Sequence, residues 1–196
     1  MTLLGTTTSP YTRKARILLN ALGRPYDFVD TRTTAGATLL GEVAPLGKVP
    51  VLVVDREGLV LSDSSLITDW LWATDGLAFR AAGWDLDPAA WADRSLQIVV
   101  EGILDAAINH RYLRLDGFAD AGYIAKQRQR VDRGLTWLEG RATFRLPLGA
   151  SALSLGCALD WIVFRNVVEL SRWPRLAAFR EAWTSAGVGA RTEPCE

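Results

Sequence analysis

The run VLVVDREGLVLSDS, residues 51–64, decides the fold of the first half of the chain. Two short apolar segments, 51–54 and 59–61, flank the polar, glycine-ending segment 55–58, which is the pattern of a β-hairpin. Ser62, Asp63 and Ser64 then form a typical helix start, ahead of apolar residues at helical spacing: Leu66, Ile67, Trp70 and Leu71. The run therefore predicts two strands followed at once by a helix.

Upstream of this run the chain alternates strand and helix signals. Residues 3–4 and 26–29 predict strands, and residues 37–43 predict a weak helix. Ser9 and Pro10 predict an N-cap and a first helical residue, followed by an apolar pattern that ends at Gly23. The resulting order, β-α-β-α-β-β-α, predicts an α/β domain with a mixed sheet over residues 1–76.

Residues 77–87 are glycine-containing and polar, and we interpret them as a linker. Beyond them the strand signals disappear. Helical spacing predicts four helices, at residues 88–115, 121–138, 154–168 and 174–186. The segment 88–196 is therefore predicted to be an all-α domain.

Composition excludes several classes of function. Of the 196 residues, 22 are Lys or Arg and 22 are Asp or Glu, so no basic surface favours nucleic acid or an anionic membrane. The two cysteines, Cys157 and Cys195, and the single His110 give no metal-site spacing and no disulfide framework. We also find no signal-peptide pattern and no long apolar span. A cytoplasmic protein without a metal is expected, with a small molecule or a second copy of the chain as its partner.

Five segments together resemble the glutathione S-transferase family. They are residues 8–16, 44–52, 61–67, 154–160 and 173–183, in the family's order and spacing. The resemblance covers nearly the whole chain and is closest to the bacterial, serine-type or omega-like members. It implies a thioredoxin-like first domain that binds glutathione, a helical second domain, a homodimer and a role in detoxification. In that dimer, the first domain of one subunit packs against the helical domain of the other.

The resemblance points to Ser9 as the catalytic residue. A helix N-terminus favours negative charge, so a glutathione thiolate would be stabilised there, and the serine hydroxyl would donate a hydrogen bond to it. The alternative is that Ser9 only caps its helix, as serine before proline often does. Thr8 and Tyr11 are the other candidate hydroxyls.

Two further motifs match the family's glutathione site. Val49 and Pro50 correspond to its cis-proline turn, where the backbone of the preceding residue pairs with the cysteinyl part of glutathione. Lys48 is expected near the glycine carboxylate, or else is an ordinary surface lysine. Asp63 and Ser64 correspond to an acidic-serine pair that binds the γ-glutamyl end, although the family more often has Glu at this position. The alternative is again a plain N-cap.

The helical half is expected to supply an apolar wall for a second substrate. Six of the eight tryptophans lie from residue 84 onward, and most of them are predicted to be core residues. His110 is expected at the surface. The family's buried capping box is incomplete, because Cys157 stands three residues after Ser154 where the family has Asp. Asp160, one turn later, is a candidate substitute.

The predicted activity is conjugation of the glutathione thiolate, as co-substrate, to small, mostly apolar electrophiles. A non-catalytic glutathione- or ligand-binding protein is the alternative from another class. Isomerisation, dehalogenation or ether cleavage with glutathione remain open. A glutaredoxin-like exchange reaction is disfavoured, because Ser9 stands where that chemistry needs cysteine.

Overall fold

The computed structural model describes residues 1–54, 58–118 and 122–196. The chain forms two compact units that are not continuous in sequence. The first contains Met1–Ala90, Leu146–Gly149 and Gly189–Glu196, and the second contains Trp91–Arg145 and Ala150–Val188. By contrast, each predicted domain, 1–76 and 88–196, is a single stretch.

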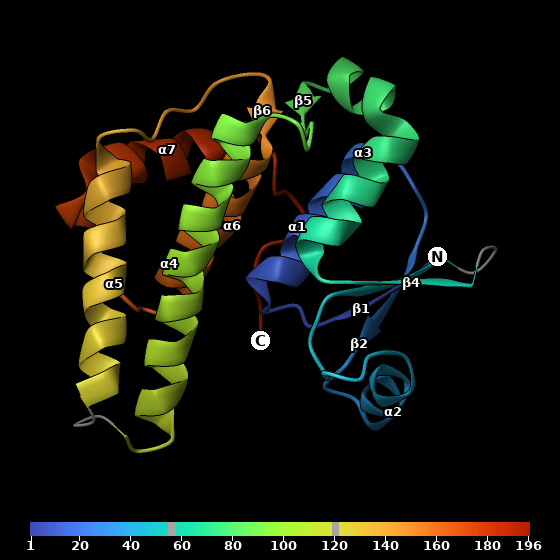
Figure 1. The fold of residues 1–196 in the computed structure, drawn as a ribbon, viewed down its shortest axis with the longest axis horizontal. Helices are drawn as coiled ribbons and strands as arrows, with labels where there is room; N and C mark the ends of the chain where they lie inside the picture. The colour runs from blue at the N-terminus through green and yellow to red at the C-terminus, as the bar shows by residue number, and fades with distance from the viewer. Residues whose placement is uncertain (55–57, 119–121) are drawn as a thin grey trace. The chain divides into compact units, whose positions relative to one another are not determined.

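The first unit has the predicted element order. Its elements are β1 (Thr2–Gly5), α1 (Pro10–Ala21), β2 (Asp27–Asp30), α2 (Thr34–Val43), β3 (Val51–Val54), β4 (Leu59–Ser62) and α3 (Ser64–Ala81) (Figure 1). The sheet order is β2-β1-β3-β4, with β1 parallel to β2 and antiparallel to β3, and β3 antiparallel to β4. This mixed four-stranded sheet is the thioredoxin-like arrangement that the resemblance implies. Of the predicted turn at 55–58, residues 55–57 lie outside the described part of the chain.

Successive side chains of the central strands β1 and β3 point to opposite faces of the sheet, and side chains on both faces are buried. Leu4 of β1 and Val51 of β3 pack with Ala44, beside the apolar side of α2. Their neighbours Leu3 and Leu52 point to the opposite face, because successive strand residues alternate, and both are fully buried. Helices covering both faces explain why these strands carry continuous apolar runs.

The predicted linker at residues 77–87 differs from what the structure shows. Helix α3 runs to Ala81 with one non-helical residue, Asp75, whose φ is −134° and ψ 20°. The helix resumes because its second part still buries an apolar side chain, Phe79. Trp84–Asp85 (β5) then pairs in parallel with Leu148–Gly149 (β6) to form a second, two-stranded sheet.

The elements of the second unit are all helical, because β6 belongs to the first unit. The second unit contains α4 (Trp91–Leu115), α5 (Gly122–Glu139), α6 (Ala150–Phe164), a 3-10 turn (Leu170–Arg172) and α7 (Pro174–Ser185). Helix α4 packs against both α5 and α6. The prediction of four helices is confirmed, although α6 begins at Ala150 rather than 154. The predicted start of α5 at residue 121 lies outside the described residues. No helix in the described ranges has the length and apolar character needed to cross a bilayer.

Candidate functional site

Strand register brings the predicted site segments to one edge of the four-stranded sheet. Leu4 pairs with Val51, and Val51 pairs with Ser62. The chain that leaves β1 toward Ser9, the chain that enters β3 from Val49-Pro50, and the chain that leaves β4 toward Asp63 therefore meet at the same edge. Helices α1 and α3 both begin here, so two helix N-termini, with the positive ends of their dipoles, lie at this edge.

Ser9 is the N-cap of α1. Its backbone is extended, with φ −77° and ψ 122°, and its Oγ accepts a hydrogen bond from the N–H of Thr12 at 3.1 Å. The N–H of Ser9 in turn donates to the carbonyl of Thr6 at 3.2 Å, which closes a turn over residues 6–9. The predicted cap is confirmed. Because the hydroxyl accepts in this contact, its hydrogen remains available for donation to a ligand.

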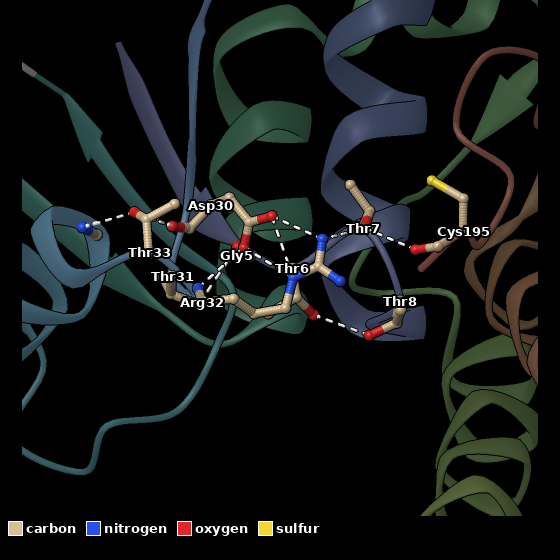
Figure 2. Close-up of polar contacts among 10 residues, drawn as sticks. Gly5, Thr6, Thr7, Thr8, Asp30, Thr31, Arg32, Thr33 and Cys195 are labelled. Atoms are coloured by element: carbon tan, nitrogen blue, oxygen red, sulfur yellow. Dashed lines mark hydrogen bonds and ion pairs between the residues drawn. The ribbon is translucent and has the colours of Figure 1, made fainter.

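The hydroxyls around Ser9 differ in their contacts. The Oγ1 atoms of Thr6 and Thr8 lie 3.3 Å apart (Figure 2). Tyr11 is half-buried, and the ammonium of Lys14 lies 5.3 Å from the centre of its ring, within range of a cation–π interaction. Tyr11 is thus packed against its own helix.

Asp63 is the N-cap of α3. Its Oδ1 accepts from the N–H groups of Ser65 at 2.8 Å and Leu66 at 3.0 Å. Its φ is +71° and ψ 158°, a conformation that costs a non-glycine residue on the order of 1–3 kcal/mol. Ser64, the first residue of the helix, is 4% exposed, whereas Asp63 is exposed. The cap uses one carboxylate oxygen for both bonds.

The third segment is the turn before β3. The Val49-Pro50 peptide bond is cis, as the resemblance implies. Ladder pairing of β3 begins at Val51, so Val49 lies just beyond the paired strand. Lys48 is exposed, next to Gly47, whose φ is +59°.

A polar network that no sequence pattern indicated lies beside this edge, at the ends of β1 and β2 (Figure 2). The guanidinium of Arg32 contacts both carboxylate oxygens of Asp30, at 2.7 to 3.1 Å. Its Nη2 also donates to Oγ1 of Thr7 at 2.8 Å, and Thr7 donates to the carbonyl of Cys195 at 2.7 Å. Hydrogen bonding to Arg32 lowers the pKa of Asp30. Cys195 is 188 residues from Thr7, so no local pattern could have revealed this contact.

Metal ligation has no structural support in the part of the chain that is described. Within residues 1–54, 58–118 and 122–196, no three His, Cys, Asp or Glu side chains are grouped as ligands. The sheet edge where α1 and α3 begin instead holds the Ser9 and Ser64 hydroxyls, the Asp63 carboxylate and two helix N-termini. That set suits a small zwitterionic ligand with carboxylates and an ammonium.

The structure of the second unit shows which residues take the place of the incomplete capping box at Ser154 and Cys157. Ser154 lies inside α6 and donates to Glu101 of α4 at 3.1 Å, so it is not a cap. The carboxylate of Asp160 accepts from Arg180 of α7 at 2.6 Å and does not replace the missing residue. The acceptor at the start of α6 is instead the carboxylate of Asp93 in α4. It accepts hydrogen bonds from both the N–H and the hydroxyl of Ser151, in the first turn of α6.

Two expectations about the second half have different outcomes. His110, expected at the surface, is buried, because it lies one turn after Ala107 on the face of α4 that also buries Ile103. Burial is also the main cause that lowers its pKa. The expectation that most of the six later tryptophans are core residues is confirmed: Trp91 and Trp137 are exposed, and the buried ones are Trp84, Trp161, Trp173 and Trp183.

Comparisons with known proteins agree with this geometry. Residues 3–78 match the sequence model of the glutathione S-transferase N-terminal domain. The chain is 29% identical, over 205 aligned positions, to the uncharacterized GST-like protein YibF of Escherichia coli K12, covering 99% of this chain and 98% of that protein.

Solved structures are similar over the same length. A glutathione S-transferase from Methylobacillus flagellatus, solved with glutathione bound, has a TM-score of 0.85 and 25% identity, covering 99% of both chains. A glutathione transferase family member from Pseudomonas fluorescens Pf-5, also with bound glutathione, has a TM-score of 0.80 and 28% identity. That comparison covers 100% of this chain and 99% of the other.

Proposed function

We propose that the chain is a member of the bacterial glutathione S-transferase family, of the serine type, and that it conjugates glutathione to small, mostly apolar electrophiles; the matching domain model and the similar relatives support this. The observation that carries this proposal is the convergence of two helix N-termini and the Val49-Pro50 turn at one sheet edge. A tripeptide with charged ends and a thiol at its centre fits such a set of groups.

The thiol of glutathione is assigned to the start of α1. The positive end of the helix dipole stabilises a thiolate there, and the hydrogen of the Ser9 hydroxyl adds one donor. A lower thiol pKa raises the thiolate fraction near pH 7, and the thiolate is the nucleophile. Holding the electrophile next to it supplies much of the remaining rate acceleration.

The two ends of glutathione are assigned to the other segments. Asp63 pairs with the γ-glutamyl ammonium through the carboxylate oxygen not used by the cap, while Ser64, the first residue of α3, receives the carboxylate at the helix N-terminus. The backbone of Val49 pairs with the cysteinyl part in the manner of an added strand. The exposed ammonium of Lys48 pairs with the glycine carboxylate.

The proposed assembly is a homodimer in the cytoplasm, with detoxification as its role. Both units expose large apolar side chains: Val60 and Leu66 in the first, Trp91 and Ile98 in the second. A two-fold dimer that pairs the first unit with the partner's second unit would cover such residues. Light scattering should report twice the chain mass at micromolar concentration; a monomer would contradict this part of the proposal.

The activity is tested by titrating the protein with glutathione calorimetrically and then measuring turnover against a panel of electrophiles. A related structure from Pseudomonas fluorescens holds S-(propanoic acid)-glutathione, a thioether of glutathione, so thioether products belong in the titration as well. Binding with turnover supports the transferase. Binding without turnover favours the ligand-binding alternative, and the absence of glutathione binding removes the proposal.

A further inference from the structure

The last eight residues of the chain, Gly189–Glu196, belong to the first unit and contact Thr7, Arg13 and Arg16, on either side of Ser9 in sequence. We call this segment the C-terminal latch. Its Thr192 Oγ1 accepts from Nε of Arg13 at 3.3 Å, and the carbonyl of Arg191 accepts from Nη2 of Arg16 at 3.1 Å. The carbonyl of Cys195 accepts from Thr7 at 2.7 Å. The contacts reach both the first turns of α1 and the loop before it.

The anchor of the latch is buried. Thr192 is 1% exposed, and its Arg13 partner is 3% exposed. The Thr192 hydroxyl accepts from Arg13 and donates to the carbonyl of Gly189 at 2.7 Å, while its N–H donates to the same carbonyl at 3.1 Å. Both roles of this hydroxyl are therefore used. A buried, fully used hydroxyl fixes the latch at a single position on α1.

From that anchor the latch extends to Thr7, two residues before Ser9. Arginine can only donate, so Thr7 Oγ1 must accept from Arg32, and its one hydrogen must go to the carbonyl of Cys195 (Figure 2). Asp30 holds Arg32 in place with both carboxylate oxygens. The result is an oriented chain of hydrogen bonds, Asp30–Arg32–Thr7–Cys195, in which every direction of donation is determined.

We infer that the C-terminal latch positions the loop at residues 6–9, so that Thr7 and the carbonyl of Cys195 act on glutathione binding through Ser9. The loop is fixed at one end by Gly5 in β1 and at the other by Pro10 in α1, and the latch holds its middle. Without this contact the loop must be ordered when the ligand binds, which weakens the apparent affinity. The inference rests on the proposed function, because it assumes that Ser9 contacts glutathione.

Two variants remove the contact, and three keep it. A chain ending at Pro194 loses the acceptor at the cost of two exposed residues, and Thr7→Val loses the donor. Thr7→Ser retains the hydroxyl, and Cys195→Ala retains the backbone carbonyl. Thr38→Val is the matched control, because the Thr38 hydroxyl is exposed and bonds the carbonyl of Thr34 in its own helix.

The first measurement is hydrogen exchange of the Ser9 amide without ligand, since this amide donates to Thr6 across the loop. The second is the dissociation constant of glutathione. The chain ending at Pro194 and Thr7→Val should exchange faster at Ser9 and bind glutathione more weakly, each by about three- to tenfold, the scale of one net hydrogen bond. Thr7→Ser, Cys195→Ala and Thr38→Val should match the wild type.

Unchanged exchange and unchanged affinity in the shortened chain would overturn the inference, whatever its melting temperature. Loss of affinity in Cys195→Ala alone would also overturn it, because the thiol rather than the carbonyl would then be responsible. If wild-type protein fails to bind glutathione, the proposed function fails. In that case faster exchange at Ser9 would still show that the latch orders the loop.

Discussion

The helices α1 and α3 begin at the same edge of the sheet, yet their first residues are held differently. Ser9 caps α1 from an ordinary extended backbone and accepts one bond, from the N–H of Thr12. Asp63 caps α3 with φ at +71° and accepts two bonds on a single oxygen. After capping, Ser9 keeps a hydrogen to donate, and Asp63 keeps a charged oxygen to accept.

This difference shows that a cap and a ligand-binding group can be the same residue without competing for the same atom. It also shows where the two roles can be separated. Asparagine caps about as well as aspartate but carries no charge, so the roles of Asp63 can be tested one at a time. The separation is less clean at Ser9, because aspartate would keep the cap and remove the donor but would also add a negative charge beside the thiolate. The following predictions use this contrast.

The largest expected effect is on ligand binding at α3. Asp63→Asn should weaken glutathione binding by about 1.5–3 kcal/mol, the scale of a lost charged hydrogen bond. Its cost in stability should be only about 0.3–1 kcal/mol, because the cap remains and only the charge at the helix N-terminus is lost. Calorimetry and urea unfolding measure the two quantities. Equal affinity in wild type and variant would remove Asp63 from the site.

A second prediction concerns the packing under the start of α1. A Cβ at Gly5 would collide with the side chain of Thr12, the residue whose N–H donates to Ser9. Gly5→Ala should therefore destabilise the protein by about 1–3 kcal/mol. Adding Thr12→Ala should recover part of this loss, because the colliding atoms are removed. A Gly5→Ala variant with the wild-type urea midpoint would show that α1 can shift freely, unlike the strained start of α3.

At Ser9 the expected effects are smaller and combined. Ser9→Ala should cost about 0.5–2 kcal/mol of stability through the lost cap alone. The informative quantity is the ultraviolet thiolate absorbance of bound glutathione across pH. If Ser9 donates to the thiolate, the variant should show a higher thiol pKa and lower turnover, although part of the effect of the helix N–H groups will survive. Superimposable titrations would leave Ser9 as a cap only, with Thr8 or Tyr11 as the remaining hydroxyls.

The smallest expected effect is a pH dependence of the free energy of unfolding. It arises from His110, which lies outside both helix starts. Burial, and then Arg128 and Arg114, lower the pKa of His110, while Asp132 opposes them. An unfolded histidine titrates near about 6.5, so below that pH the unfolded state gains a proton that the folded state resists. Stability should therefore fall as pH drops through this range, and His110→Gln should flatten the curve of unfolding free energy against pH. An identical curve in the variant would contradict this assignment.

Sequence reasoning predicted the parts of the structure that depend on neighbouring residues. The hairpin, the caps at Ser9 and Asp63, and the order of strands and helices all follow from patterns a few residues long. The resemblance to a family supplied the cis bond at Val49-Pro50, which the dipeptide alone does not imply. Whether these segments bind glutathione remains a prediction.

Contacts between distant residues were not predictable. The cap of α6 comes from Asp93 on another helix, 58 residues away from Ser151, so the missing capping box at Cys157 gave a misleading signal. Asp160 was suggested as the substitute, but it contacts Arg180 instead. The pairing of β5 with β6 and the latch on Thr7 likewise join segments that no periodicity connects. His110 was misplaced although the end of α4 at residue 115 was predicted correctly, because its side chain continues the buried face formed by Ile103 and Ala107.

The discontinuity of the first unit has a consequence for synthesis. Translation proceeds from the N-terminus, and residues 1–90 leave the ribosome long before residues 146–149 and 189–196, which complete the same unit. The four-stranded sheet can form early, because all its strands lie within the first 62 residues. The carbonyl that holds Thr7 is made only after the entire helical segment. The loop that carries Ser9 is therefore among the first parts of the protein to be synthesised and among the last to be held in place.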